Sequence, residues 1–214
     1  MIIAIDGPAG SGKSAVGRRV AEALGLPFVD SGLMYRAVAI VAAQRGIPLE
    51  AEAELERLAA SLDLRVSGPD LTADGEDLTG RIYAPDVSAG SSRVAAVAGV
   101  RRELVGKQRA LGGTGVVMAG RDIGTVVFPG AGDKFYLTAS AAERARRRTR
   151  QIEARGGTAA AADLQREIEE RDRRDAGRAV SPMHPAPDAE VIETDGLDLE
   201  AVVAEVLRRV GDRQ

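Results

Sequence analysis

The 214-residue sequence contains no cysteine, no tryptophan and only one histidine, and aromatic residues make up just 3% of it. The absence of cysteine excludes disulfides, thiolate metal sites and a cysteine nucleophile. So few aromatic side chains argue against nucleic-acid binding through base stacking. No stretch approaches the roughly 20 apolar residues that cross a bilayer, and the N-terminus lacks a signal-peptide pattern. We therefore expect a cytoplasmic protein with no membrane partner.

The charge balance is that of a soluble globular protein. Hydrophobic residues make up 44% of the chain and charged residues 29%, and the formal net charge is -3. No global basic field attracts nucleic acid or an anionic membrane, so any basic chemistry must be local. The length suffices for one sizeable core with small insertions.

A glycine-rich stretch near the N-terminus matches the pattern G-x-x-x-x-G-K-[ST]. It consists of Gly7, Pro8, Ala9, Gly10, Ser11, Gly12, Lys13 and Ser14, and it follows an apolar run that predicts a buried strand. In such a loop successive backbone N–H groups and a helix N-terminus converge on phosphate. Lys13 reaches the terminal phosphates of a nucleoside triphosphate and the Ser14 hydroxyl holds Mg²⁺. The alternative is a glycine-rich turn without a ligand.

Strand and helix patterns alternate along most of the chain, which predicts an α/β fold with parallel strands and right-handed crossovers. Buried strands are expected at 2–5, 27–29, 115–119, 134–137 and 191–192. Helices are expected at 15–24, 33–44, 50–62 and 199–210, with two more within 85–111 that meet near Ala98 and Gly99.

Two segments depart from this alternation. Short strand candidates at 64–66, 70–72 and 76–78 are divided by turn residues and predict a small antiparallel meander that packs on the main body. Arginine-rich helices at 139–153 and 164–175, the second restarting from the alanine run at 159–162, contain few large apolar residues. Most of their arginines are expected to pair with neighbouring glutamates in solvent, and a few to close over phosphates as a lid.

Several polar residues lie where a parallel sheet gathers its ligands, at the carboxyl ends of strands. Arg36 follows the second strand and either binds an anion or lies on a solvated helix face. Arg121 and Asp122 follow a central strand and form either part of an active site or a buried salt bridge. Ser92 and Arg101 are either ligands or surface residues, since their spacing fits both.

Four blocks of sequence resemble the bacterial cytidylate kinases, a branch of the nucleoside monophosphate kinases. These blocks are IDGPAGSGKS at 5–14, DSG at 30–32 followed by Tyr35 and Arg36, GRDIGTVVFP at 120–129, and ERD at 170–172 followed by Asp175, Arg178, Ala179 and Val180. The resemblance covers essentially the whole chain. It implies a three-layer P-loop kinase fold with a five-stranded parallel sheet, a monophosphate-binding insertion and a helical lid. It also implies transfer of the γ-phosphoryl group of ATP to CMP or dCMP.

The same resemblance assigns roles to individual residues. It implies that Ser31, Arg36, Ser92, Arg101, Arg121, Asp122, Asp175 and Arg178 bind CMP. Within this set it implies that cytosine is recognised by Ser92, Arg101 and Asp122. It implies that the acceptor phosphate is bound by Arg36, Arg121 and Arg178, and the sugar by Asp175. It further implies catalytic contacts to the phosphates in transit from Lys13, Arg121, Arg171 and Arg178.

The chemistry of these residue types suits the implied reaction. Arginine holds two phosphate oxygens with its planar fork, and phosphoryl transfer needs positioning and charge neutralisation rather than a covalent nucleophile. A carboxylate such as Asp122 accepts a hydrogen bond from the cytosine amino group, whereas uracil would leave that group mispaired.

Two positions depart from the family pattern. Ala119 stands where relatives often have an acidic residue, so an acidic contact to Mg²⁺ from this position is missing. Gly99 stands where a proline is common, which is expected to loosen the approach of Arg101.

The expected organisation is a core at 1–62, 93–139 and 178–214, a monophosphate-binding insertion at 63–92 and a lid hairpin at 140–177, acting as a monomer. Three other functions stay open: a kinase for another small acceptor such as another nucleotide or shikimate, an ATPase switch that acts through a protein partner, and an RNA-binding protein. The acidic residues among the lid arginines weaken the last of these.

Overall fold

Five parallel strands form the central sheet of the computed structural model, which describes the chain except for residues 155, 159, 179 and 213–214. The strand order is β2-β6-β1-β7-β8, and every neighbouring pair is parallel. The strands are β1 (Ile2–Asp6), β2 (Phe28–Asp30), β6 (Val116–Gly120), β7 (Asp133–Thr138) and β8 (Glu190–Glu193). The predicted sheet and all five of its strands are confirmed. Ala159 and Ala179, which belong to the predicted alanine run and the fourth sequence block, lie outside the described residues.

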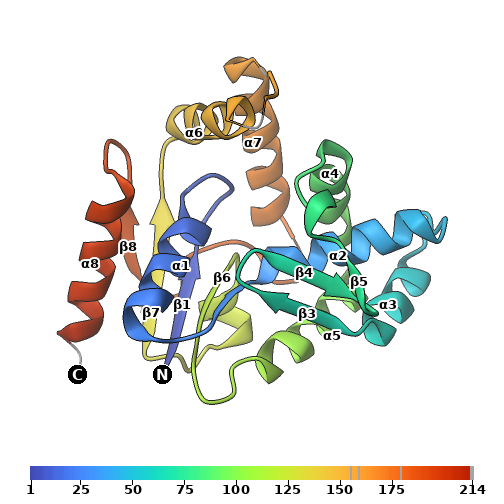
Figure 1. Cartoon of the computed structure of the whole chain (residues 1–214), viewed down its shortest axis with the longest axis horizontal. Helices are drawn as coiled ribbons and strands as arrows, with labels where there is room; N and C mark the ends of the chain where they lie inside the picture. Colours follow the sequence, from blue (N-terminus) through green and yellow to red (C-terminus); the bar gives the residue numbers. More distant parts are fainter. Residues whose placement is uncertain (155, 159, 179, 213–214) are drawn as a thin grey trace.

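Helices cover both faces of this sheet (Figure 1). On one face, α1 (Lys13–Leu24) and α8 (Leu199–Gly211) bury valines against Ile3, Ile5 and their neighbours. On the other face, Met118 packs with Val105 of α5 (Ala98–Ala110) and with a π-helical turn, Ile123–Val127. Burial of these apolar faces is what holds the three layers together.

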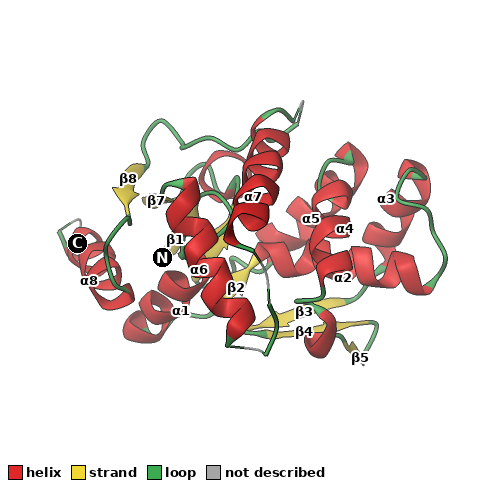
Figure 2. Ribbon diagram, turned by 90° about the horizontal axis from the view of Figure 1, so that it is seen from above, coloured by secondary structure: helices red, strands yellow, loops and turns green. Residues whose placement is uncertain are grey.

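A second apolar core lies beside the sheet, where α2 (Ser31–Gln44) joins four other elements. They are α3 (Glu52–Ser61), α4 (Pro85–Val94), α5 and an antiparallel sheet of β3 (Leu64–Ser67), β4 (Asp70–Ala73) and β5 (Glu76–Asp77). Figure 2 shows this small sheet against α2, with one end beside β2 at the edge of the central sheet. Because Leu71 and Leu78 are fully buried in the second core, the predicted packing of the meander on the main body is confirmed.

The arginine-rich helices α6 (Ala141–Glu153) and α7 (Ala161–Ala176) stand above the carboxyl ends of the strands (Figure 1). Their shared apolar cluster is small, with Ala145, Leu164 and Ile168 buried and Ile152 packed against them. Glu143 binds Arg146 and Arg147, but its side chain is only 12% exposed, so these two ion pairs are more buried than predicted. Arg144 differs from the prediction, because it is buried, ion-paired with Asp172 and bonded to the Ala9 carbonyl.

Apart from the lid, the helices also follow the predicted order. The break between α4 and α5 falls at residues 95–97, slightly before the predicted position, and a 3-10 turn (Thr79–Arg81) precedes α4. No described helix is both long enough and apolar enough to cross a membrane.

Candidate active site

The glycine-rich loop joins β1 to α1, as the motif predicts. Gly7, Gly10 and Gly12 have φ angles of +148°, +80° and +92°, which side-chain-bearing residues rarely adopt. A Cβ atom on Gly7 would lie 2.1 Å from the backbone oxygen of Leu137, so the loop also needs glycine for space. The loop therefore has the backbone freedom that a phosphate cradle requires.

Lys13 folds back over this loop and donates from Nζ to the Pro8 carbonyl at 2.9 Å. Burial lowers its pKa well below the ordinary value, and the positive charge of Arg121 adds to this effect. Both effects disfavour the charged form of Lys13. The negative charge of an anion bound in the loop would favour the charged form and so would offset both effects.

Ser14, in the first turn of α1, contacts Asp30 at the end of β2. The Ser14 hydroxyl donates to Oδ2 of Asp30 at 2.6 Å, while Oδ1 of Asp30 accepts from the Gly32 amide at 2.9 Å and caps α2. Serine and carboxylate oxygens suit Mg²⁺, which commonly takes few protein ligands and completes its shell with phosphates and water. The described residues contain no cluster of three or more Asp, Glu, His or Cys that could hold a metal ion.

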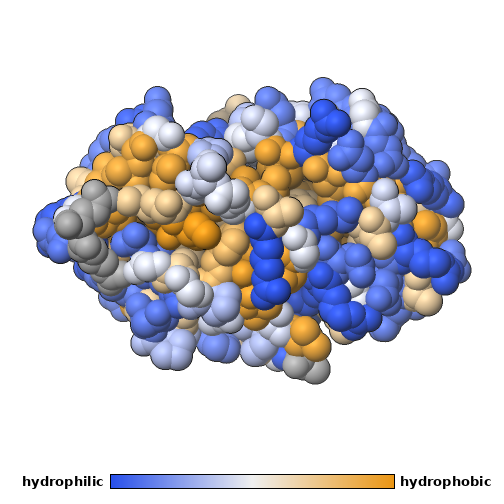
Figure 3. All heavy atoms as spheres, turned by 90° about the horizontal axis from the view of Figure 1, so that it is seen from below, coloured by the Kyte–Doolittle hydropathy of each residue, from blue (hydrophilic) through white to orange (hydrophobic). Residues whose placement is uncertain are grey.

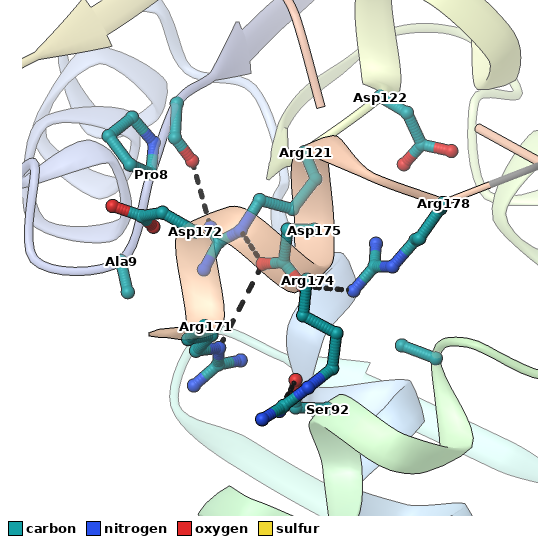
Figure 4. Close-up of polar contacts among 12 residues, drawn as sticks. Pro8, Ala9, Ser92, Arg121, Asp122, Arg171, Asp172, Arg174, Asp175 and Arg178 are labelled. Atoms are coloured by element: carbon teal, nitrogen blue, oxygen red, sulfur yellow. Dashed lines mark hydrogen bonds and ion pairs between the residues drawn. The ribbon is translucent and has the colours of Figure 1, made fainter. Parts of the chain in front are cut away.

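Three arginines meet around Asp175, whose side chain is 1% exposed (Figure 4). Arg121 donates from Nε to Asp175 at 3.0 Å, Arg178 pairs with the other oxygen, and Arg171 lies at 3.9 Å. Although burial raises it, these arginines hold the pKa of Asp175 below its usual range. Burial lowers the pKa of Arg171 to about 10. The single carboxylate leaves an excess of buried positive charge, which suits binding of several phosphate groups.

Arg121 and one further arginine, Arg36, extend this positive surface. Arg121 also donates from Nη1 to the Gly7 carbonyl at 2.9 Å, so it connects the phosphate loop to Asp175. Arg36, on α2, donates to Ser88 Oγ at 3.1 Å and to the Ile82 carbonyl. Of the three arginines expected at the acceptor phosphate, Arg121 and Arg178 share Asp175, and Arg36 approaches the cleft from α2.

Arg101 and Asp122 form a buried ion pair with side chains 3% and 6% exposed. Arg101 also bonds to the Ala95 carbonyl at 3.2 Å and lies 5.4 Å from the centre of the Tyr35 ring. Gly99 therefore does not prevent Arg101 from reaching Asp122. The Nε groups of Arg101 and Arg178 are buried without a hydrogen-bond partner in the described part of the chain, so each keeps a donor for a ligand.

Ser92 lies apart from this pair and accepts a hydrogen bond from Arg174 of α7 at 2.8 Å (Figure 4). The structure thus brings together two of the three residues expected at cytosine. Sequence reasoning gave no role to Arg174, since nothing in its local pattern distinguishes it from the other exposed arginines of the lid.

Apart from Ser92, Gly7 and Pro8, the expected residues line one cleft of about 820 Å³ between the phosphate loop, α2, the end of β6 and α7. Its lining includes Gly10, Gly12, Lys13, Ser14, Ser31, Arg36, Arg101, Arg121, Asp122, Arg171, Asp175 and Arg178. The cleft thus extends from the triphosphate loop to the Arg101–Asp122 pair. Ser31 itself donates to the Ala119 carbonyl at 2.9 Å, which ties α2 to β6.

Asp6 is a buried carboxylate that sequence reasoning left without a role. Its two oxygens accept from the amides of Ile123 and Gly124, both at 2.8 Å, and so hold the π-helical turn against the end of β1. Burial raises the pKa of Asp6 to about 6. The available signal was an acidic residue directly after a buried strand.

Comparison with known proteins identifies close relatives. The family model "Cytidylate kinase" matches residues 3–212. Cytidylate kinase of Pelotomaculum thermopropionicum is 48% identical over 97% of this chain and 95% of its own length, and that of Stutzerimonas stutzeri is 45% identical over 99% and 96%. A bifunctional pantoate ligase/cytidylate kinase of Synechococcus is 50% identical over 97% of this chain, which spans only 40% of that relative.

Among solved structures, a shikimate kinase from Acinetobacter baumannii aligns with a TM-score of 0.51 and 16% identity, covering all of this chain and 94% of its own. That likeness supports the P-loop kinase fold alone. The family model and the full-length relatives agree with the geometry of the cleft, and they show that this chain belongs to the cytidylate kinase family.

Proposed function

We propose that this chain transfers the γ-phosphoryl group of Mg²⁺-bound ATP to CMP or dCMP, giving ADP and CDP or dCDP. The observation that carries the proposal is a single cleft containing the phosphate loop, Arg36, Arg121 and Arg178, and the buried Arg101–Asp122 pair. A triphosphate site alone would serve an ATPase, whereas a second group of arginines and a buried polar pair beyond it suit a nucleoside monophosphate.

In the proposed donor half, amides of the loop and Lys13 bind the β- and γ-phosphates. Mg²⁺ would be held by Ser14 and the phosphates, and when bound it neutralises the charge that develops on the phosphate oxygens. Lys13 gives up its bond to the Pro8 carbonyl and turns to the phosphates.

In the proposed acceptor half, Arg36, Arg121 and Arg178 hold the phosphate of CMP so that one of its oxygens attacks the γ-phosphorus while the bond to ADP breaks. Arg121 contacts both the Gly7 carbonyl and Asp175, so it lies where the two phosphate groups must meet. Arg171 approaches the same place from α7 and would stabilise the group in transit.

The Arg101–Asp122 pair provides a basis for recognising cytosine. Asp122 accepts from the amino group of the base, and Arg101 donates to its ring acceptors. Ser92 reaches the base once Arg174 releases its hydroxyl, and Asp175 receives the sugar beside the arginines. Uracil presents a carbonyl oxygen where cytosine has its amino group, which places an acceptor against the Asp122 carboxylate.

The proposed moving parts are the insertion at 63–92 and the lid at 140–177, which close over the acceptor and the phosphates. The chain supplies all the assigned residues itself, in keeping with a monomer that uses ATP and CMP or dCMP. The cytoplasmic location and the absence of a nucleic-acid partner stay predictions of the sequence.

The test is a coupled assay of ADP formation with ATP and, in turn, CMP, dCMP, UMP, AMP, GMP and shikimate. We expect the highest kcat/KM values for CMP and dCMP, with UMP at least about 100-fold poorer because a buried hydrogen-bonding group would be mispaired. Equal or faster use of UMP or AMP would overturn the base assignment. A rate of ADP formation that is the same with and without each acceptor would favour the ATPase alternative.

A further inference from the structure

The contact between Ser14 and Asp30 has a direction, and this direction matters for metal binding. Only the hydroxyl can donate at the 2.6 Å contact with the ionised carboxylate, so the Ser14 proton points at Asp30. The lone pairs of the Ser14 oxygen are then left for another partner. A hydroxyl that ligates a cation needs this arrangement, with its proton held elsewhere and its oxygen presented to the metal.

Asp30 also lies next to the position at which the family's acidic residue is missing. In the register of the central sheet, Asp30 of β2 pairs with Ala119 of β6, two residues after Phe28 pairs with Val117. Because side chains alternate along strands, Asp30 and Ala119 project to the same face as Phe28 and Val117, the face covered by α1. Ser14 lies in the first turn of that helix.

We propose that Asp30 is the acidic positioning residue of the Mg²⁺ site, doing from β2 what an acidic residue at position 119 would do from β6. Asp30 holds the Ser14 hydroxyl in its ligating orientation, and its carboxylate also accepts from water bound to the metal. This inference rests on the proposed use of Mg²⁺-bound ATP but not on the identity of the acceptor.

The surroundings of Asp30 agree with this role. Burial lowers the pKa of both Lys13 and Arg36, and the negative charge of Asp30 partly opposes this lowering at each of them, so Asp30 acts on both the donor and the acceptor side of the cleft. Asp30 itself lines the cleft beside Ser14. A carboxylate here repels metal-free ATP and attracts the metal complex, so the metal should change the sign of its effect.

The test is nucleotide binding without any acceptor, using Asp30→Asn. The dissociation constant of a fluorescent ATP analogue is measured in excess Mg²⁺ and again in EDTA. An asparagine that still caps Gly32 presents its amide N–H to Ser14 and occupies the lone pair that the metal needs. We expect the tightening by Mg²⁺ to shrink about tenfold or more, while the affinity in EDTA stays equal or improves.

A purely structural role for Asp30 predicts a different pattern. If Asp30 serves only to cap α2, its replacement weakens binding equally in Mg²⁺ and in EDTA, and that result would overturn the proposal. An unchanged Mg²⁺ effect would overturn it as well. Asp30→Ser is the matched variant, because a serine keeps an N-cap oxygen for Gly32 but is too short to bond Ser14. It should lose the Mg²⁺ effect as Asp30→Asn does.

A second experiment tests whether an acidic residue at position 119 of β6 can replace Asp30 of β2. Mn²⁺ binding to the protein–ATP complex, followed by the electron paramagnetic resonance signal of free Mn²⁺, should weaken in Asp30→Asn and recover at least partly in Asp30→Asn/Ala119→Asp. Failure of a folded double variant to recover would refute the equivalence of positions 30 and 119. Because neither experiment includes CMP, a failed substrate panel and a failed metal test remain distinguishable.

Discussion

Arg36 is the residue that best separates binding of the two substrates. It lies on α2, in contact with Ser88 and the Ile82 carbonyl, whereas Lys13 belongs to the loop itself. Arg36→Ala should raise the KM for CMP by about 100-fold and leave the affinity for ATP within about twofold, since one charged phosphate contact is lost. Lys13→Ala should abolish transfer. Equal losses for CMP and ATP in Arg36→Ala, measured by kinetics and ATP titration, would contradict its acceptor role.

The Arg101–Asp122 pair is expected to matter for stability as well as for recognition. Arg101→Met leaves the Asp122 carboxylate buried without its partner, which should lower the free energy of unfolding by about 3–5 kcal/mol in urea denaturation. Arg65→Met is the control, because the Arg65–Asp63 pair is 79% and 63% exposed and should contribute less than about 1 kcal/mol. Similar losses from the two variants would show that burial does not decide the effect.

Asp6 should make stability depend on pH in an unusual direction. The pKa of Asp6 is raised from 3.8 to about 6, so between these pH values the folded protein binds a proton that the unfolded chain does not. The stability that this proton contributes is therefore lost as pH rises from about 4 to 6. The free energy of unfolding of the native protein minus that of Asp6→Asn should therefore fall by up to about 3 kcal/mol between pH 4 and 7. A difference that is constant across this range, measured by urea unfolding, would contradict the raised pKa.

At the scale of elements, two glycines test what the loop and a helix require. Gly7→Ala combines an unfavourable φ with a contact to the Leu137 backbone, and it should abolish ATP binding and lower the thermal midpoint markedly. Gly106→Ala, in the middle of α5 with open space around it, should raise stability by about 0.5–1 kcal/mol. Thermal melts and ATP titrations of the two variants check both expectations, and a stable, ATP-binding Gly7→Ala would refute the first.

The elements of the fold could be predicted because apolar periodicity and turn residues are local signals. Strand β6 is a short apolar run and β1 is one up to its last residue, Asp6, and the phosphate loop is defined by its own spacing. The π-helical turn at Ile123–Val127 was not foreseen, because it depends on the Asp6 carboxylate from a strand more than a hundred residues earlier. Long-range contacts of this kind produce no recognisable pattern in the local sequence.

The same limit applies to the site. Most of the residues that the sequence blocks indicated do lie in one cleft, because the carboxyl ends of parallel strands meet there. They did not indicate that Ser92 would bond to Arg174, or that Asp30 would receive the Ser14 proton. Both contacts join elements whose relative placement is set by packing of the whole chain.

At the scale of the whole molecule, the proposed lid, α6 and α7, has the smallest apolar cluster among the described residues. Its helices share a small core and are tied to the body through polar contacts, such as Arg147 to Thr194 and Arg174 to Ser92. Backbone amides of α6 and α7 should therefore exchange with deuterium faster than those of β1 and β6, and slow by about tenfold when CMP and a non-hydrolysable ATP analogue bind together. Amides of β1 and β6 serve as the internal control, and equal protection of lid and sheet without ligands would contradict the prediction.

The direction of the strands has a further consequence for how the protein can be handled and joined to others. Met1 at the start of β1 and the end of α8 both lie at the edge of the molecule away from the phosphate loop and the lid (Figure 1). The face seen from that side has apolar groups gathered over its upper left and centre, with hydrophilic side chains among and around them (Figure 3). An affinity tag, a surface tether or a fused enzyme attached at either end would leave the entrance to the cleft open, so both ends are suitable points of attachment.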